Sequence, residues 1–412
     1  MAALVQGLHS LELGRLDERS KDDADAGAAL LPHSTDNQIA QICRAPCVKR
    51  NEQAWKWYAS IGAPKLFVAP LVGYSEPAFR LLCRSYGAHV ASTPMIDAAG
   101  YAASERYRAE FAFTGGPNDR PLTTQLGGSD PAALAAVATL VAPYCDAVEL
   151  NMGCPQRCAK KNMSGAFLME DPSRAVRCIM AMRRALDAHN AASNGPHVAT
   201  IVKIRCFEDV PKTVALAQAL EAAGAEMITV HGRTRHAGGG RRIAAQLANW
   251  AWIRAVKESV GIPCVSNGNI RHADDVRDCF AATGCDGVMS GVGALRRPQL
   301  VYAGVRGGRN KVAAQYCTHA LTTHAAPRQV HSHLCGKLAL TAPAAIKDIR
   351  ESINSLDVSG PETDRSRATI SSLRVAFLAQ PDDDDEEDED AAEGETPIAD
   401  DGWTKVWRDK RL

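Results

Sequence analysis

Short apolar and β-branched segments recur along the chain from Lys65 onward, and stretches with helical character separate them. Eight segments are predicted to be strands: residues 66–69, 89–93, 121–126, 147–151, 200–205, 227–232, 263–268 and 286–291. Several of the intervening stretches open with Asp or Ser next to Pro and close with Gly, which are helix start and stop signals. Eight alternating units in about 240 residues predict an α/β fold of the (β/α)8 TIM barrel type over residues 64–305. An open doubly wound sheet is the alternative, but neither a P-loop nor a GxGxxG motif follows the first segment.

The pattern is weaker on both sides of the predicted barrel. Residues 1–60 are rich in Ala, Asp and Ser without periodicity, so a disordered or loosely attached arm is expected. Residues 306–375 predict a small C-terminal helical domain, on the strength of the segment PRQVHSHLCGKLAL. Residues 376–412 form an acidic tail with a basic end, and both tails are expected to be disordered.

Composition restricts the setting in which the chain works. The 47 basic and 47 acidic residues balance, but the acidic run near the C-terminus implies that the folded part is basic. Thirteen irregularly spaced cysteines and the absence of an apolar leader favour a reducing compartment, so a cytoplasmic or nuclear location is expected. No window reaches the roughly 18 continuous apolar residues of a membrane helix, so no membrane partner is expected. The oligomeric state is left open.

Polar or special residues follow most of the predicted strands. In a barrel of this type the active site lies at the C-terminal ends of the strands. The candidate site residues at these ends are Pro70, Leu71, Val72, Gln125, Asn151, Cys154, Lys203, Arg205, His231, Arg233, Asn267, Gly268, Asn269, Gly291 and Val292. Packing requirements explain one or two such residues but do not explain six strand ends out of eight.

The last two strand ends resemble a phosphate site. The segments SNGN and SGVG supply Gly-rich turns whose backbone N–H groups can face an anion, as a cofactor phosphate in a barrel requires. For either loop alone, tight turns explain the glycines equally well. The occurrence of both loops favours the phosphate interpretation.

Lys203 would place a charge inside an apolar barrel, which is costly without a partner. Near a reduced flavin it could stabilise negative charge, while Gln125 and His231 hydrogen-bond the ring edge. Taken alone, His231 is better explained as a satisfied core histidine. Its equivalence to Lys203 and Gln125 at neighbouring strand ends favours the cofactor interpretation.

Cys154 has three interpretations. It is a buried structural thiol, a metal ligand together with Cys158, or a catalytic acid or nucleophile. The metal interpretation lacks a second Cys or His pair at a recognised spacing, so no metal is expected. The nearby Arg157, Lys160 and Lys161 would favour a thiolate or poise a proton donor.

Seven segments resemble, in order, the motifs of the tRNA-dihydrouridine synthases. They are APLVGYSEPAFRLLCRSYGAHVASTPMI, RPLTTQLGGSDP, ELNMGCPQRCAKK, KIR, ITVHGRTR, SNGNI and DGVMSGVGAL, across residues 64–300. Within the family, STPMI, GCPQ and NGNI are most similar to the eukaryotic enzymes that modify two adjacent D-loop uridines, with the cytoplasmic enzymes for other D-loop sites as close competitors.

The resemblance implies an FMN-dependent reduction of the uracil 5,6 double bond in tRNA with NADPH as electron donor. Hydride would reach C6 from the flavin, and Cys154 would protonate C5. The FMN-contacting positions would be Pro70, Leu71, Val72, Gln125, Lys203, His231, Asn267, Gly268, Asn269, Gly291 and Val292. The substrate-binding residues would be Asn151, Arg157, Lys160, Lys161, Arg205 and Arg233, with the basic side chains near the RNA phosphates.

Three departures from the family pattern keep alternatives open. Asn162, Met163 and Ser164 replace a usual run that includes Tyr, Val292 stands where many relatives have Arg, and only VHSHL (330–334) resembles the start of the family's helical tRNA-binding domain. A flavin barrel oxidoreductase of the dihydroorotate dehydrogenase kind is one alternative function. A catalytically impaired RNA-binding protein is the other.

Overall fold

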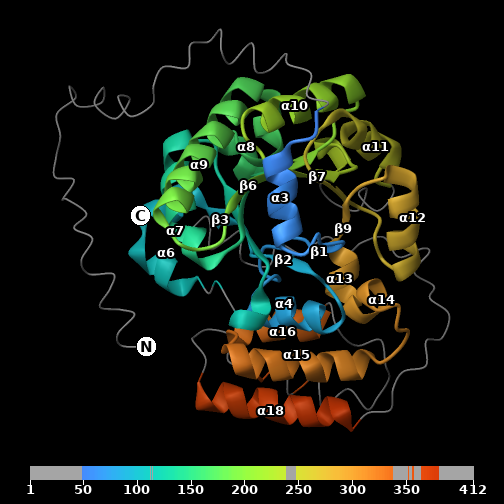
Figure 1. Ribbon diagram of the computed structural model, residues 1–412. Helices are drawn as coiled ribbons and strands as arrows, with labels where there is room; N and C mark the ends of the chain where they lie inside the picture. Colours follow the sequence, from blue (N-terminus) through green and yellow to red (C-terminus); the bar gives the residue numbers. More distant parts are fainter. Residues whose placement is uncertain are drawn as a thin grey trace. The chain divides into compact units, whose positions relative to one another are not determined.

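A closed barrel of parallel strands forms the centre of the molecule in a computed structural model (Figure 1). The structure describes residues 49–379 apart from 112, 114, 238–246, 337–350, 352–354 and 357–362. The strands are β1 (Leu66–Val68), β2 (Val90–Ser92), β3 (Ile96–Asp97), β4 (Leu122–Gly127), β5 (Ala147–Met152), β6 (Ala199–Arg205), β7 (Met227–His231), β8 (Cys264–Asn267) and β9 (Gly287–Ser290). Strand β2 pairs with both β1 and β4, and this pairing closes the sheet. The (β/α)8 TIM barrel prediction is therefore confirmed, and the open-sheet alternative is wrong.

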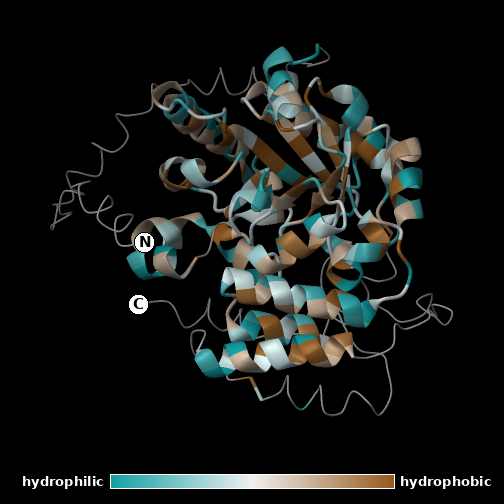
Figure 2. Cartoon of the chain, turned by 60° about the horizontal axis from the view of Figure 1, so that its bottom comes forward, coloured by the Kyte–Doolittle hydropathy of each residue, from teal (hydrophilic) through white to brown (hydrophobic). Residues whose placement is uncertain are grey.

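Every predicted strand segment contains a strand. The structure adds β3, which pairs with β4 and, with two residues, is too short to produce a recognisable sequence pattern. The α-helices are α3 (Glu52–Ser60), α4 (Pro77–Ser85), α5 (Ala98–Ala103), α6 (Glu105–Glu110), α7 (Pro131–Val141), α8 (Arg157–Lys161), α9 (Pro172–Ala192), α10 (Val210–Ala222), α11 (Trp250–Ser259), α12 (Ala273–Thr283), α13 (Val292–Arg296), α14 (Pro298–Tyr302), α15 (Arg309–Thr323), α16 (Pro327–Gly336) and α18 (Asp364–Leu378). The 3-10 turns are η3 (Pro117–Asp119), η4 (Ala142–Tyr144), η5 (Gly165–Glu170) and η6 (Arg235–Ala237). Figure 2 shows that the strands of the barrel are largely hydrophobic and that the helices around them carry both hydrophobic and hydrophilic residues.

Helix starts follow the sequence signals. The side chains of Asp130, Asp171 and Asp209 each accept a hydrogen bond from a backbone N–H in the first turn of α7, α9 and α10. Each satisfies a donor that the helix itself leaves unpaired. Pro in the first turn costs nothing there, because its missing N–H would have had no partner.

The predicted arm extends too far. Helix α3 packs Trp57 and Tyr58 against the apolar interior of the barrel, with 4% and 2% of their surfaces exposed. The Trp57 indole N–H donates to the Asp146 carbonyl at 3.3 Å, and the Tyr58 hydroxyl donates to the Pro64 carbonyl. The arm prediction is wrong for residues 52–60 because two aromatic rings bury enough apolar surface to order this helix. The rest of the arm up to residue 48, and residues 380–412 of the tail, lie outside the described residues.

Helices α15, α16 and α18 form a group beside α4 (Figure 1). A buried polar cluster joins this group to the barrel: Glu76, at the start of α4, accepts from the Tyr316 hydroxyl at 2.9 Å and lies 3.0 Å from His333 Nε2. The His333 ring also stacks on Phe79, with centroids 5.0 Å apart. The VHSHL segment therefore supplies the histidine through which α16 contacts the barrel.

A buried ion pair fixes the loop that precedes β4. Arg80 on α4 contacts the Asp119 carboxylate with its Nη2 at 2.6 Å and its Nε at 3.1 Å, and neither side chain is exposed. The remaining Arg80 donors reach the Ser75 and Phe113 carbonyls. Asp119 also accepts from the Gly115 backbone N–H at 3.0 Å. Nearly all polar atoms of the pair are thus satisfied, as burial of two charges requires.

Within the described part of the chain, no helix combines the length and the apolar character needed to cross a membrane.

Candidate active site

The ends of β4 to β8 place polar side chains at one rim of the barrel. In the parallel register Gln125 lies opposite Glu149, Asn151 opposite Lys203, and His231 opposite both Arg205 and Asn267. Residues opposite each other in register point to the same face of the sheet. The topology therefore brings together side chains that come from five separate stretches of sequence.

A chain of hydrogen bonds runs along this rim to Cys154. Gln125 donates to Glu149 at 2.6 Å and accepts from the Asn151 amide at 2.7 Å. The Asn151 oxygen then accepts from the backbone N–H groups of Gly153 and Cys154, at 3.0 and 2.9 Å. Because both ends of its amide are used here, Asn151 positions the cysteine loop. The resemblance implies a substrate contact for the same residue.

Arg205 holds the same loop from the other side. Its Nε donates to the Gly153 carbonyl at 2.6 Å and its Nη1 to the Thr234 carbonyl at 3.0 Å. Burial lowers the pKa of Arg205 to about 10, with Arg233 adding to the effect. The resemblance implies that Arg205 binds substrate, and in the structure two of its donors bind the backbone on both sides of the site.

Cys154 is half-buried, and burial raises the pKa of its thiol above the ordinary value. Arg205 and a backbone hydrogen bond from Gln156 act in the opposite direction but do not offset burial. The thiol is therefore protonated at neutral pH. Of the chemical roles considered for it, this state suits a proton donor and not a nucleophile.

Gly165 packs directly against Cys154. Its backbone has φ +57°, and an added Cβ would lie 2.6 Å from the Cys154 carbonyl oxygen and 3.1 Å from the Cys154 Cβ. The next residue, Ala166, donates its N–H to the same carbonyl at 2.9 Å. A side chain at residue 165 would thus have to displace the cysteine.

Gly165→Ala is expected to destabilise the protein by more than the about 1–2 kcal/mol that a left-handed backbone costs a non-glycine residue. Gly284→Ala is the matched control, because Gly284 has φ +64° and open space around it. Urea unfolding of both variants separates backbone strain from the clash. Gly165→Ala should also change the reactivity of Cys154, and equal unfolding midpoints for the two variants would contradict the clash.

Two buried ionisable side chains, Lys203 and Glu149, influence each other's pKa at this rim. The Lys203 Nζ donates to the Asn267 Oδ1 at 2.8 Å, and the Asn267 Nδ2 donates to the Met289 carbonyl at 2.9 Å. Burial lowers the pKa of Lys203 to about 8 and raises the pKa of Glu149 to about 7, while each group's charge opposes the other's shift. Lys203 therefore has the polar partners that its charge requires in the barrel.

His231 lies on the same rim, beside the positive side chains of Arg205, Lys203 and Arg233. Burial and the charges of Arg205, Lys203 and Arg233 hold the pKa of His231 well below its ordinary value, so the ring is neutral. Its Nδ1 is buried and has no hydrogen-bond partner within the described part of the structure. A neutral histidine with an unused buried nitrogen is suited to bind a ligand atom.

The turn after β1 contains the predicted cofactor residues Pro70, Leu71 and Val72. Pro70 and Leu71 are half-buried, and Val72 has 41% of its surface exposed. The Leu71 N–H donates to the Ser75 hydroxyl at 3.0 Å, which fixes the turn.

The two Gly-rich loops differ in the reason for their glycines. Gly268 has φ +117°, and an added Cβ would lie 2.6 Å from the Ala248 Cβ, so packing explains it. The Asn269 side chain bonds the backbone of Ala248 in both directions at 2.9 Å and therefore holds a neighbouring segment. At Gly291 an added Cβ would have only ordinary contacts, the nearest at 3.4 Å from the Ala69 Cβ. Gly291 and Val292 are both half-buried and leave backbone available to a ligand.

The basic residues Arg157, Lys160 and Lys161 lie exposed on α8, just after the cysteine loop. The atypical residues Asn162 to Ser164 form the turn that ends this helix, and Met163 has 43% of its surface exposed. Arg233 donates to the Asn269 Oδ1 at 3.1 Å and thus connects the ends of β7 and β8. Exposed charge gathers on one side of Cys154.

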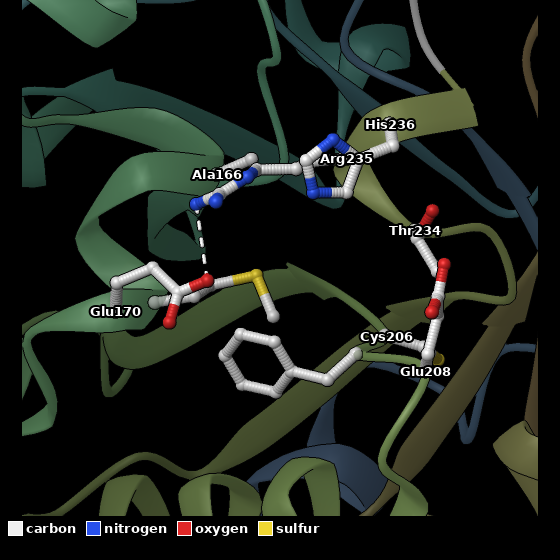
Figure 3. Close-up of a pocket in the computed structure, with 9 residues that line it drawn as sticks. Ala166, Glu170, Cys206, Glu208, Thr234, Arg235 and His236 are labelled. Atoms are coloured by element: carbon white, nitrogen blue, oxygen red, sulfur yellow. Dashed lines mark ion pairs between the residues drawn. The ribbon is translucent and has the colours of Figure 1, made fainter.

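A cavity of about 200 Å³ adjoins the cysteine loop (Figure 3). It is lined by Ala166, Met169, Glu170, Cys206, Phe207, Glu208, Thr234, Arg235 and His236. The Arg235 guanidinium pairs with Glu170 at 3.1 Å, and Figure 3 shows the two side chains reaching toward each other. The cavity is therefore lined by both apolar and charged side chains.

The sequence did not single out Glu149 or Gly165. The only signal for Glu149 was a carboxylate within the otherwise apolar segment AVELN. Gly165 has no local signal, because its requirement arises from contact with a loop eleven residues earlier. Among the described residues, no group of three or more His, Cys, Asp or Glu side chains is placed to hold a metal ion.

The barrel and its strand-end site define an α/β barrel protein of the kind that binds ligands at its C-terminal rim. The family model described as dihydrouridine synthase (Dus) matches residues 67–354, and the chain belongs to this family. A Rattus norvegicus protein named as a tRNA-dihydrouridine(16/17) synthase-like protein is 42% identical over 245 residues, covering 59% of this chain and 53% of that protein.

Two further relatives are also named as tRNA-dihydrouridine synthases. A Saccharomyces cerevisiae tRNA-dihydrouridine(16/17) synthase is 38% identical over 259 residues, covering 62% of this chain and 58% of its own. A Homo sapiens protein named as a tRNA-dihydrouridine(20a/20b) synthase-like protein is 35% identical over 235 residues, covering 56% of this chain and 69% of that protein. The first group of names confirms the resemblance to enzymes acting on positions 16 and 17. The chain spans little more than half the length of the 16/17 relatives.

Proposed function

We propose that this protein reduces uridine to 5,6-dihydrouridine in tRNA, with FMN as cofactor and NADPH as electron donor. Two of its relatives have names that include NAD(P)(+) and the tRNA positions 16/17. These names support adjacent D-loop uridines as the target. The observation that carries the proposal is the position of Cys154, whose loop is held by Asn151 and Arg205 at a rim that also contains Lys203 and His231.

The residues at the rim fit a flavin. Positive charge from Lys203, Arg205 and Arg233 suits a ring that becomes electron-rich, and the unused His231 Nδ1 is available to a ring atom. Gly291 has no steric requirement within the protein, as expected for a loop that a phosphate approaches closely. Gln125 and Asn267 would complete the contacts, with Pro70 and Leu71 at the edge. When bound, reduced FMN supplies the hydride that C6 of uracil receives.

Cys154 would give its proton to C5 and so balance the hydride at C6. The thiolate that remains lies near the positive charge of Arg205, and it regains a proton from water. Exposed Arg157, Lys160 and Lys161 would bind phosphates of the RNA and help to offset the few kcal/mol needed to unstack the target base. Helices α15, α16 and α18 would add RNA contacts.

The test is formation of dihydrouridine in unmodified tRNA by purified protein with FMN and NADPH, mapped to the nucleotide by mass spectrometry. Product at two adjacent D-loop uridines is expected. Reduction of a free pyrimidine with none of tRNA would instead favour an oxidoreductase of the dihydroorotate dehydrogenase kind. Binding of tRNA without bound flavin and without product would favour the RNA-binding scaffold.

A further inference from the structure

Glu149 is a buried carboxyl group that the proposed reaction does not use. It has no exposed surface, and it lies on β5 two residues before Asn151, so both side chains point to the same face. Its Oε1 accepts from Gln125 at 2.6 Å, whereas its Oε2 is buried without a partner in the described residues. Such an arrangement is costly, so a structural reason alone would favour an apolar side chain here.

The hydrogen-bond chain from Glu149 has a fixed direction. A side-chain amide donates through nitrogen and accepts through oxygen, so an acceptor at residue 149 turns the Gln125 nitrogen toward it and the Gln125 oxygen toward Asn151. The Asn151 nitrogen then faces Gln125, and its oxygen faces the N–H groups of residues 153 and 154. The acceptor at the start of the chain thus determines that an acceptor meets the cysteine loop at its end.

Loss of that acceptor would remove this constraint. The Gln125 amide would be free to turn over, and its nitrogen would then face the Asn151 nitrogen. Asn151 could relieve that contact between two donors only by presenting its own nitrogen to the loop. Two backbone donors would face a third donor, which leaves buried N–H groups unsatisfied. The loop would have to move, and Cys154 would move with it.

We propose that Glu149 is a positioning residue that places Cys154 by orienting the amides of Gln125 and Asn151. Its effect on catalysis rests on the proposed function, but its effect on the cysteine loop does not. The structural elements involved are the ends of β4 and β5 and the loop after β5, which Gly165 covers from the other side.

Two matched variants test the proposal. Glu149→Gln keeps an oxygen that accepts from Gln125, and Glu149→Met has similar length and no acceptor. Both remove the charge near Lys203, so a difference between them reports the loss of the polar group at residue 149 and not the loss of charge. The readout is the rate of iodoacetamide labelling in the flavin-loaded protein, because it measures thiol accessibility independently of turnover.

Trypsin makes the measurement specific. Cleavage after Arg157 places Cys154 and Cys158 in different peptides, and fragment ions distinguish Cys154 from the buried Cys145 in the same peptide. Cys158 is exposed four residues later and serves as an internal control. Glu149→Met should label Cys154 faster by about three- to tenfold, the factor that one buried hydrogen bond corresponds to, with Cys158 unchanged. Glu149→Gln should stay close to wild type.

Gln125→Met interrupts the chain one link later and serves where Glu149→Met does not fold. Because Gln125 is also proposed to contact the flavin, the labelling of this variant is compared with that of wild type, both free of flavin, and it should show the same increase. The double variant should exceed neither single variant, because all three break one chain. Equal labelling of Cys154 in wild type and in both methionine variants, or an equal increase in Glu149→Gln and Glu149→Met, would overturn the proposal.

Turnover provides a second readout. Glu149→Met should lower kcat for dihydrouridine formation and leave KM for tRNA unchanged, with Glu149→Gln restoring most of the rate. If wild-type protein makes no dihydrouridine, the proposed function fails, and the labelling comparison still decides whether Glu149 positions Cys154.

Discussion

Cys154→Ala is expected to lower the rate of dihydrouridine formation by about 10²–10⁴-fold, the range that general acid catalysis contributes. The methyl group cannot donate a proton to C5, but the loop is held mainly through its backbone, by Asn151, Arg205 and Ala166. Flavin binding and tRNA affinity should therefore change little. The measurement is a single-turnover rate with tRNA, together with the flavin absorption spectrum.

Cys158→Ala is the matched control, because this exposed thiol lies four residues away in the same basic segment. It should retain the wild-type rate. The wild-type rate should also fall as pH rises through the thiol pKa, since only the protonated thiol donates, and burial places that pKa above its ordinary value. A Cys154→Ala variant with wild-type turnover would assign the proton to another group.

The barrel was predictable because its information is local. Eight short apolar segments and the Asp-Pro helix starts each occupy a few consecutive residues, and they define the order of strands and helices. Cys154, Lys203 and His231 were predictable for a related reason. Each is a polar residue directly at a strand end, where the fold itself locates the site.

The contacts among these residues were not predictable from local pattern. Glu149 on β5 accepts a hydrogen bond from Gln125 on the neighbouring β4. Asn269 accepts one from the backbone of Ala248, which lies 21 residues earlier. Both contacts form because the barrel brings distant positions together. Helix α3 was missed for the same reason, since its aromatic residues find their partners only inside the closed barrel. The Glu76 and His333 contact likewise spans 257 residues.

Asp119→Ala is expected to destabilise the folded protein by about 3–5 kcal/mol, the range for breaking one partner out of a buried ion pair. The variant would leave the Arg80 guanidinium fully buried without its carboxylate, and Arg84 would lose a partner at 3.4 Å. The Gly115 N–H would lose its acceptor as well. The urea midpoint, measured with tryptophan fluorescence, should fall strongly while the slope of the transition stays the same.

Asp278→Ala is the control for charge removal alone. Asp278 pairs with Arg277 at 3.0 Å, but both side chains are more than half exposed, so solvent already screens the pair. Its unfolding midpoint should match that of the wild type. Asp119→Asn keeps the shape of Asp119 but removes the charge and replaces one accepting oxygen by an NH2 donor, which would face donors of Arg80, Arg84 or Gly115. It should therefore destabilise the protein as well. If Asp119→Asn is as stable as wild type, neither the charge nor the second accepting oxygen of Asp119 stabilises this loop, and the Arg80 guanidinium tolerates burial beside a neutral amide.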